Sequence, residues 1–364
     1  MKNMIYMEKS IKKNKYLLVM EYFSPHIMGG AEISGQIMYD IFKKTKLIHI
    51  LTPNYDKFKL SIKNNIIKYP SFRYFLYKNK TKSTKLRQKN KKIFSKLQNV
   101  FFIISAIEMS IWIFFIKIIY NKNIIHGNNF ESNLAVLLSP VNSKKYIHLR
   151  DTIFFDKKRS LLRKLIKTLF KWQSNKYFCI SEYIKKQYIK ILKDKKNKYI
   201  IRYNNTDKTQ ISDLNKYESR KILKLPENKN IILYVGSLTE EKGIDYVFEN
   251  LINKFPSSLF LICGDGYLKE KLTKYKKKYN NFILKGNIKN EKLKYYYKAS
   301  DITIVPSKWN EPYGRVSIES QINQTYTIVS DKGGLPETII SKKTGICTKL
   351  HNFEKIIKLK LKKF

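Results

Sequence analysis

The sequence predicts an α/β protein made of two doubly wound domains, each built around a mainly parallel β-sheet. Its 364 residues suffice for two domains of ordinary size, and 43% of them are hydrophobic, so each domain can bury a core. Short apolar runs alternate with helical patterns along most of the chain. Strands that alternate with helices form parallel sheets with right-handed crossovers, and such sheets bind ligands at the carboxyl ends of their strands.

The first half of the chain shows this alternation with polar interruptions. A buried strand is expected over 16–22, and Gly29-Gly30 separates it from a helix that ends near Phe42. A glycine pair here serves turn geometry or lets a ligand approach the backbone closely. Later elements are strands over 47–52, 123–126, 145–149, 177–181 and 199–202, a helix that ends at Leu138, and a helix capped by Ser181.

The second half shows a cleaner alternation. The expected strands lie over 231–235, 259–263, 282–284, 302–305 and 327–329, and the helices between them end at Phe255, run over 291–299 and open near Arg315. From Asn204 to Leu225 the chain is polar and less regular. We therefore expect an N-terminal domain over 1–207, a linker over 208–225 and a C-terminal domain over 226–364, with a ligand cleft between the two domains.

The stretch after the strand 302–305 carries the clearest candidate site. The strand stops at a proline, a turn with Pro312 and Gly314 follows, and a helix opens at Arg315. This order places the backbone N–H groups of Tyr313, Gly314 and Arg315 at the positive end of a helix. Such a helix end binds phosphate.

Two carboxylates, Glu311 and Glu319, frame this helix start. Ionised carboxylates accept several hydrogen bonds at once, as the hydroxyls of a sugar or a ribose require. Alternatively they are two surface acids on an ordinary loop and helix. The functional interpretation is favoured because acids are scarce in this chain.

The charge of the chain is extreme, with 73 Lys and Arg against 28 Asp and Glu, or +45 overall. It predicts a polyanionic partner: nucleic acid, an anionic membrane or a phosphorylated substrate. A drift in codon usage explains part of the excess, because Lys, Asn, Ile, Tyr and Phe are abundant together. Specific nucleic-acid binding is not favoured, since the basic residues are scattered and form no known module.

A basic segment over 78–98 precedes an apolar, aromatic helix over 100–120. The basic segment is a solvated surface or a patch that binds anionic lipid. Glu108 and Lys117 interrupt the apolar helix, which favours a buried or interfacial helix over a membrane span. Together they predict a protein that sits on a membrane.

The sequence gives no sign of a metal or a resident cofactor. Cys179, Cys263 and Cys347 lie far apart in apolar settings, as buried thiols of a reducing compartment do. The histidines show no ligand spacing, and the chain contains no Asp-x-Asp. The first fifteen residues are basic, but the apolar run after them is too short for a signal peptide, so we expect a cytoplasmic protein.

Several ordered motifs make the chain resemble a known family. They are EPYGRVSIE with PSKWN before it and VSDKGGLPETI after it, GSLTEEKGIDYV, ICGDGYLKEKL and LKGNIKNEKL, and more thinly GGAE, YFCISEYI and NNTD. This set resembles the retaining GT-B glycosyltransferases of family four, the glycosyl transferases group 1. The resemblance implies the GT-B fold, in which two Rossmann-like doubly wound domains face each other across a cleft.

The resemblance also implies roles for single residues. Glu319 would hold the nucleotide ribose, Glu311 the hydroxyls of the donor sugar, and Lys242 the leaving diphosphate. Glu311 and Lys242 are the implied catalytic residues, together with Asp151. The implied donor-binding residues are Gly30, Gly236, Ser237, Lys242, Gly264, Glu311, Tyr313, Gly314, Arg315 and Glu319.

The chain departs from the family pattern at two positions. Ser237 stands where the family commonly has an arginine for the diphosphate, and Arg315 or a lysine is a candidate replacement. Arg150-Asp151 stands where a His-Asp pair is common. An arginine binds phosphate or carboxylate but cannot shuttle a proton.

The resemblance implies transfer of a sugar, with retention of configuration, from a UDP- or GDP-linked donor to a glycan or lipid-linked acceptor. The leaving phosphate would help to take the acceptor's proton, and no metal or cofactor is expected. We expect a role in cell-surface polysaccharide or lipopolysaccharide synthesis, peripheral to the cytoplasmic face of the inner membrane. The alternatives are a non-catalytic GT-B subunit that binds other proteins and a basic nucleic-acid-binding protein.

Overall fold

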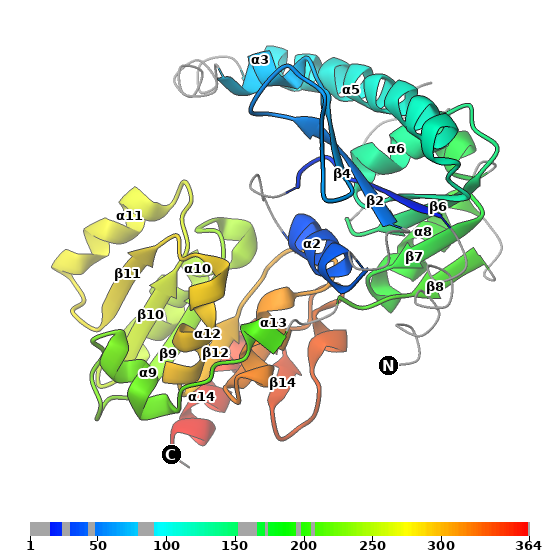
Figure 1. Cartoon of the computed structure of the whole chain (residues 1–364). Helices are drawn as coiled ribbons and strands as arrows, with labels where there is room; N and C mark the ends of the chain where they lie inside the picture. Colours follow the sequence, from blue (N-terminus) through cyan, green and yellow to red (C-terminus); the bar gives the residue numbers. More distant parts are fainter. Residues whose placement is uncertain are drawn as a thin grey trace. The chain divides into compact units, whose positions relative to one another are not determined.

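The computed structural model describes residues 15–23, 30–42, 48–78, 91–151, 166–171, 174–193, 198–204 and 208–362. The chain divides into two compact units, Met1–Asn205 and Thr206–Phe364. Each unit has one β-sheet with helices packed against it (Figure 1). The predicted pair of Rossmann-like α/β domains is therefore confirmed.

The first unit contains an eight-stranded sheet in the order β3-β4-β2-β1-β5-β6-β7-β8. All neighbouring strands are parallel except β3 and β4. The strands are β1 (Tyr16–Val19), β2 (Ile48–Asn54), β3 (Ser61–Lys63), β4 (Ile66–Pro70), β5 (Ile124–Gly127), β6 (Lys144–Leu149), β7 (Lys176–Cys179) and β8 (Tyr199–Ile201). The helices are α2 (Gly30–Phe42), α3 (Arg73–Lys78), α5 (Lys91–Tyr120), α6 (Phe130–Leu138) and α8 (Glu182–Leu192).

Local signals set the ends of several of these helices. Ser181 Oγ accepts a hydrogen bond from Ile184 N at 3.1 Å, so the predicted cap of α8 is confirmed. Asn129 and Ser132 form a reciprocal capping box at the start of α6. Of the basic segment expected over 78–98, residues 79–90 lie outside the described residues, and Lys91 already belongs to α5.

The second unit contains a six-stranded, fully parallel sheet in the order β11-β10-β9-β12-β13-β14. Its strands are β9 (Ile231–Val235), β10 (Leu259–Cys263), β11 (Phe282–Gly286), β12 (Ile302–Val305), β13 (Tyr326–Ser330) and β14 (Gly345–Thr348). Its α-helices are α9 (Lys216–Ile222), α10 (Ile244–Tyr246), α11 (Lys269–Lys274), α12 (Asn290–Ala299), α13 (Arg315–Ile322) and α14 (Phe353–Leu361). Short 3₁₀ or π turns are η4 (Lys208–Gln210), η5 (Glu240–Lys242), η6 (Val247–Leu251), η7 (Ile252–Lys254), η8 (Tyr275–Lys277), η9 (Leu335–Thr338) and η10 (Leu350–Asn352).

Each sheet has a point at which its strand order reverses. In the second unit β10 lies on one side of β9 and β12 lies on the other. In the first unit the same relation holds for β1, with β2 on one side and β5 on the other. Ligands of open α/β sheets bind where the loops diverge at such a point, at the carboxyl ends of the strands.

Residues 208–225, expected to be a linker, are folded into the second unit. They form η4 and α9. Asp301, directly before β12, accepts hydrogen bonds from Arg220 Nη2 at 2.8 Å and from Ile231 N at 2.7 Å, and it pairs with Lys216. The stretch looks irregular in sequence because Asp301, to which it is bound, lies far along the chain.

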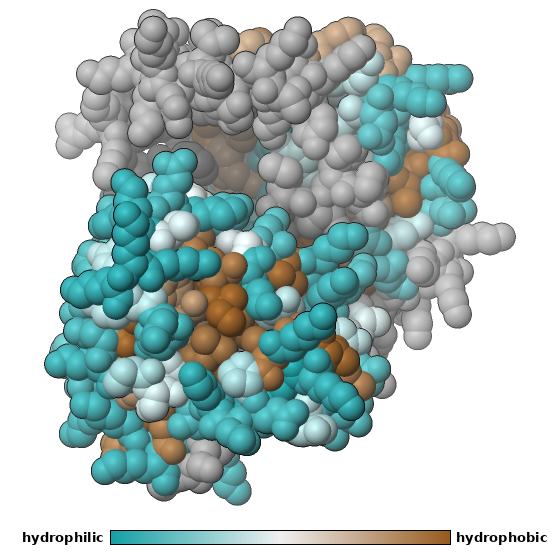
Figure 2. Space-filling view, turned by 90° about the vertical axis from the view of Figure 1, so that its left-hand side faces the viewer, coloured by the Kyte–Doolittle hydropathy of each residue, from teal (hydrophilic) through white to brown (hydrophobic). Residues whose placement is uncertain are grey.

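The lysine-rich helix α14 (Phe353–Leu361) is amphipathic. Phe353 and Ile357 are fully buried in the core of the second unit, while the lysines face outward. In the view of Figure 2 hydrophilic residues cover most of this unit's surface, as the lysine-rich composition requires.

Candidate functional site

The loops that follow β9 and β12 are held together by backbone packing. Gly243 adopts a φ of 73°, and a Cβ at this position would overlap the carbonyl oxygen of Pro306. Lys308 N donates to Glu241 O at 2.9 Å. These contacts fix Lys242 beside the turn that follows β12, at the point where the strand order reverses.

Lys242 and Glu311 form an ion pair in this turn. Lys242 Nζ donates to Glu311 Oε1 at 2.6 Å, and Ser307 Oγ donates to the same oxygen at 2.7 Å. The Lys242 ammonium also lies 4.9 Å from the centre of the Trp309 ring. Glu311 is buried, whereas the Lys242 side chain is 30% exposed and open to a ligand. Glu311 Oε2 accepts no hydrogen bond from the residues that the structure describes.

The glycines after β13 support the backbone of Glu311. Gly333 has a φ of 62°, and a Cβ there would overlap Glu311 O. Gly334 N donates to that oxygen at 2.7 Å. Both glycines therefore hold the turn that presents the carboxylate.

Glu319 lies in the first turns of α13 inside a buried polar cluster. Its Oε1 accepts from Arg315 Nε at 3.0 Å and Arg315 Nη2 at 2.7 Å, and its Oε2 accepts from Tyr297 Oη at 2.9 Å. Arg315 Nη2 also donates to Gln210 Oε1 at 3.2 Å. Burial, together with the Glu319 charge, raises the pKa of Tyr297 well above its usual value, so this phenol stays a donor.

Helix α13 begins at Arg315, as expected. Gly314 occupies the position before the helix with a φ of 131°, and a Cβ there would lie 2.5 Å from Leu335 Cδ2. The first N–H groups of a helix have no partner within it. Gly314 and Arg315 therefore offer amide donors at the positive end of α13.

Gly236, Ser237 and Gly264 lie at the ends of β9 and β10. Gly264 has a φ of 148°, and a Cβ there would overlap Gly236 O, so these glycines join two loops. Tyr234 Oη donates to Ser237 O at 2.8 Å and holds the loop in place, while the Ser237 side chain is exposed. The structure thus gives Gly236 and Gly264 a backbone packing role beside their predicted donor contacts.

The other predicted site residues belong to the first unit. Gly30 begins α2, and Gly29 lies outside the described residues. Asp151 is exposed directly after β6, while the neighbouring Arg150 is buried and donates to Asn128 Oδ1 from Nε at 3.1 Å and from Nη2 at 2.9 Å. The structure brings together the predicted residues of the second unit, while Gly30 and Asp151 belong to the first unit.

A polar network at the reversal point of the first sheet was not predicted. Arg73 Nη1 donates to Glu21 Oε1 at 2.8 Å, and Arg73 also pairs with the buried Glu131. Asn129 Nδ2 donates to Glu21 Oε2 at 3.0 Å. Of these residues, only Glu21 and Asn129 could have been found from the sequence, because each follows an apolar run that predicts a strand.

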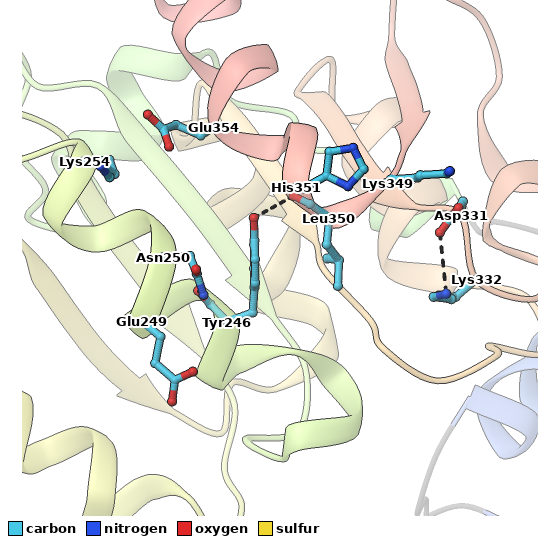
Figure 3. A pocket seen from close by; sticks show the side chains of 10 residues that line it. All are labelled: Tyr246, Glu249, Asn250, Lys254, Asp331, Lys332, Lys349, Leu350, His351 and Glu354. Carbon is cyan, nitrogen blue, oxygen red and sulfur yellow. Dashed lines mark hydrogen bonds and ion pairs between the residues drawn. The ribbon is translucent and has the colours of Figure 1, made fainter.

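A separate pocket of about 690 Å³ lies in the second unit (Figure 3). Tyr246 Oη donates across it to Leu350 O at 2.6 Å and ties α10 to η10, the turn directly before α14. Its walls carry opposite charges, for example Glu249 and Lys254, and none of the predicted site residues lines it. Within the described ranges, no three His, Cys, Asp or Glu side chains are placed to hold a metal ion.

Comparison with known proteins shows what this chain is similar to. Residues 215–362 match the model of the family described as glycosyl transferases group 1. An uncharacterized 41.2 kDa protein in the cps region of Klebsiella pneumoniae is 30% identical over 131 residues, 35% of each chain. An uncharacterized glycosyltransferase of Methanocaldococcus jannaschii, MJ1178, is 27% identical over 199 residues, 51% of this chain and 50% of the relative. The matches thus span half or less of these curated relatives.

The solved structure of Anabaena Alr3699/HepE in complex with UDP superposes with a TM-score of 0.67. The alignment covers 96% of this chain and 90% of that one at 16% identity, so the similarity is one of fold. The chain therefore has the fold of GT-B glycosyltransferases, and its second unit matches the model of the glycosyl transferases group 1.

Proposed function

We propose that this chain is a retaining glycosyltransferase that moves a hexosyl group from a UDP- or GDP-linked donor to a glycan or lipid-linked acceptor. The observation that carries the proposal is the Lys242–Glu311 pair at the reversal point of the second sheet, beside the amide donors of α13. A cation, a helix start and a partly unpaired carboxylate together match a sugar diphosphate.

The reaction breaks the bond between the anomeric carbon and the β-phosphate oxygen, and the acceptor oxygen forms the new bond to that carbon. Lys242 and the amides of α13 stabilise the negative charge that develops on the leaving diphosphate. That phosphate oxygen takes the acceptor's proton. Glu311 Oε2 receives hydroxyl groups of the sugar and orients it.

We do not assign Arg315 to the diphosphate, although it was a candidate to replace the cation missing at Ser237. Its guanidinium is held by Glu319 and Gln210, so it orients the ribose-binding carboxylate. Lys242 then remains the diphosphate cation, and Ser237 provides none. Glu319 Oε2, which accepts one bond from Tyr297, keeps a lone pair for a ribose hydroxyl.

We assign the acceptor to cell-surface polysaccharide or lipopolysaccharide synthesis. The relative in a Klebsiella cps region supports this assignment. The UDP complex of the Anabaena structure supports a nucleotide donor. No metal enters the proposed reaction, because the fixed cation and the amides supply the positive charge.

Calorimetry with UDP and GDP tests the proposal. The chain should bind at least one of them, and Glu319→Ala should abolish that binding. Glu354→Ala removes an acid whose partner is the neighbouring Lys358 and should leave binding unchanged. Failure of the unaltered chain to bind either nucleotide would count against a transferase.

Two other outcomes identify the alternatives. A non-catalytic subunit would bind nucleotide, yet it would neither hydrolyse nor transfer from any member of a nucleotide-sugar panel. A nucleic-acid-binding protein would bind DNA or RNA with an affinity that falls steeply with salt, as phosphate contacts require.

A further inference from the structure

Helix α5 carries apolar side chains on its outward side as well as on its inward side. Over Phe101–Tyr120 it is long and apolar enough to cross a membrane by length and composition. Its outward side carries Ile104, Ile107, Ile111, Phe115, Ile118 and Ile119, which are 45–68% exposed. Its inward side carries the buried Met109, Ile113 and Ile116 together with the small or polar Ser105, Ala106 and Ser110. A helix on a water-facing surface carries polar residues on its outer side, so this outer face is not built for water.

The inward side is fixed to the first unit by hydrogen bonds. Glu108 accepts from Ser71 Oγ at 2.6 Å and from Phe72 N at 3.1 Å. Ser105 Oγ donates to the buried Glu131 at 2.5 Å. A membrane span would have to leave these partners, which is unfavourable for a buried carboxylate network. These hydrogen bonds therefore hold α5 along the surface of the first unit, with its apolar side facing outward.

The apolar face of α5 continues onto β3 and the loop before it. The ring of Phe72, directly before α3, lies 6.4 Å from that of Phe101 in α5. The ring of Phe75 in α3 lies 5.2 Å from that of Phe58 in the loop before β3, so aromatic side chains around α3 connect α5 to this loop. Phe58, Leu60 and Ile62 are all exposed. Figure 1 shows α3 beside the first turns of α5.

Lysines alternate with these apolar side chains. Lys57, Lys59 and Lys63 are exposed and line a surface pocket of about 600 Å³ together with Lys68. The acid before this run, Asp56, is paired with Lys68 at 3.7 Å. Apolar residues that insert and cations between them are the chemistry that binds a bilayer with anionic headgroups.

We propose that the outer face of α5 and the 57–63 segment form a membrane-docking surface, which lies flat on a bilayer that contains anionic lipid. The apolar face is about 30 Å long at 1.5 Å per residue. It inserts at the level of the acyl boundary, and the lysines pair with lipid phosphates. The lysines between the apolar side chains favour an anionic bilayer over a second copy of the chain. A second copy also carries a net charge of +45, so two copies would repel each other. The inference is independent of the donor and the reaction proposed above.

Cosedimentation of the full chain with vesicles tests the docking surface. We expect binding to vesicles that contain about one third phosphatidylglycerol, and much weaker binding to pure phosphatidylcholine. The triple variant Ile104→Gln/Ile111→Gln/Ile118→Gln should lose about tenfold or more in partitioning. Its melting temperature should not fall, because the replaced side chains are exposed.

Matched controls come from the second unit. Ile222→Gln/Ile340→Gln/Leu359→Gln changes apolar side chains of comparable exposure, 51–57%, and should leave vesicle binding unchanged. Equal losses in both triple variants would overturn the proposal.

The lysines have a separate test. Lys57→Gln/Lys59→Gln/Lys63→Gln should lower binding to anionic vesicles by up to about a hundredfold and leave binding to neutral vesicles unchanged. Lys276→Gln/Lys277→Gln, on an exposed turn of the second unit, is the charge control.

Orientation distinguishes docking from spanning. Nitroxide labels placed singly at Ile104→Cys, Ile111→Cys and Ile118→Cys should report one immersion depth if the helix lies flat. A graded depth along the helix would overturn the proposal in favour of a span. Absence of vesicle binding, with light scattering that shows a dimer broken by the isoleucine variant, would overturn it in favour of a second copy.

Discussion

Lys242 and Glu311 share one hydrogen bond in the second unit, so removal of the lysine changes the site without removing the carboxylate. We expect Lys242→Met to lower kcat for sugar transfer about 10²–10³-fold, because it removes the one cation assigned to the leaving diphosphate. Release of the nucleoside diphosphate measures this loss. Lys308→Met is the matched control, since Lys308 lies in the turn that holds Glu311 and pairs with Asp245 at 2.5 Å. Similar losses in the two variants would contradict the role given to Lys242.

His49 makes the stability of the first unit depend on pH. Its Nδ1 lies 2.6 Å from Lys122 Nζ, and burial together with the Lys122 charge lowers the pKa of His49 from 6.5 to about 4. Because the folded state holds this imidazole neutral, its contribution to stability is present above pH 6.5 and is lost as the pH falls through about 4. We expect His49→Gln to flatten the decline of melting temperature over this interval. His351→Gln, on an exposed turn, should leave the decline unchanged.

At the scale of the elements, Gly243 joins the loops after β9 and β12 by close backbone contact. A Cβ at Gly243 would overlap Pro306 O, whereas at Gly286, with a similar φ of 70°, a Cβ would meet nothing within 4 Å. Gly286→Ala should therefore show the cost of positive φ alone, about 1 kcal/mol. Gly243→Ala should cost about 1–3 kcal/mol more through overpacking. Urea unfolding measures both, and equal losses would contradict the packing argument.

Five of the six strands of the second unit could be predicted because each is a largely apolar run that ends at a glycine, a proline or a polar residue. Parallel sheets buried on both faces produce this pattern. The sixth strand, β14 (Gly345–Thr348), was missed. The β3–β4 hairpin was missed, since all three residues of β3, Ser61–Lys63, are exposed and carry no burial pattern. Helix α14 was missed because lysines hide the spacing of Phe353 and Ile357.

Part of the candidate site could also be predicted from the sequence. Glu311 and Glu319 stood out as acids in a basic chain, and the structure places each in a defined hydrogen-bond cluster. Tyr297 and Gln210, which complete the Glu319 cluster, lie far from it in sequence and form no local pattern. Only the folded sheet brings them together, so the sequence could not indicate them.

At the scale of the whole molecule, Asp301 ties the segment that enters the second unit to its sheet. It accepts from Arg220 and Ile231 and pairs with Lys216. We expect Asp301→Asn to destabilise the second unit by about 3–5 kcal/mol, because it leaves the buried Arg220 guanidinium without its counter-charge. Asp213→Asn removes an exposed partner of Lys294 and should leave stability unchanged. Denaturant unfolding followed by circular dichroism measures both variants.

The exposed isoleucines of α5 have a consequence for the tolerance of the chain to mutation. Glutamine at Ile111 or Ile118 is tolerated by the fold because these side chains are exposed, while leucine at Ser105 or Ala106 is not, because those sites are fully buried. A saturation scan scored for protein abundance would therefore accept polar residues at the two exposed isoleucines and reject larger apolar residues at Ser105 and Ala106.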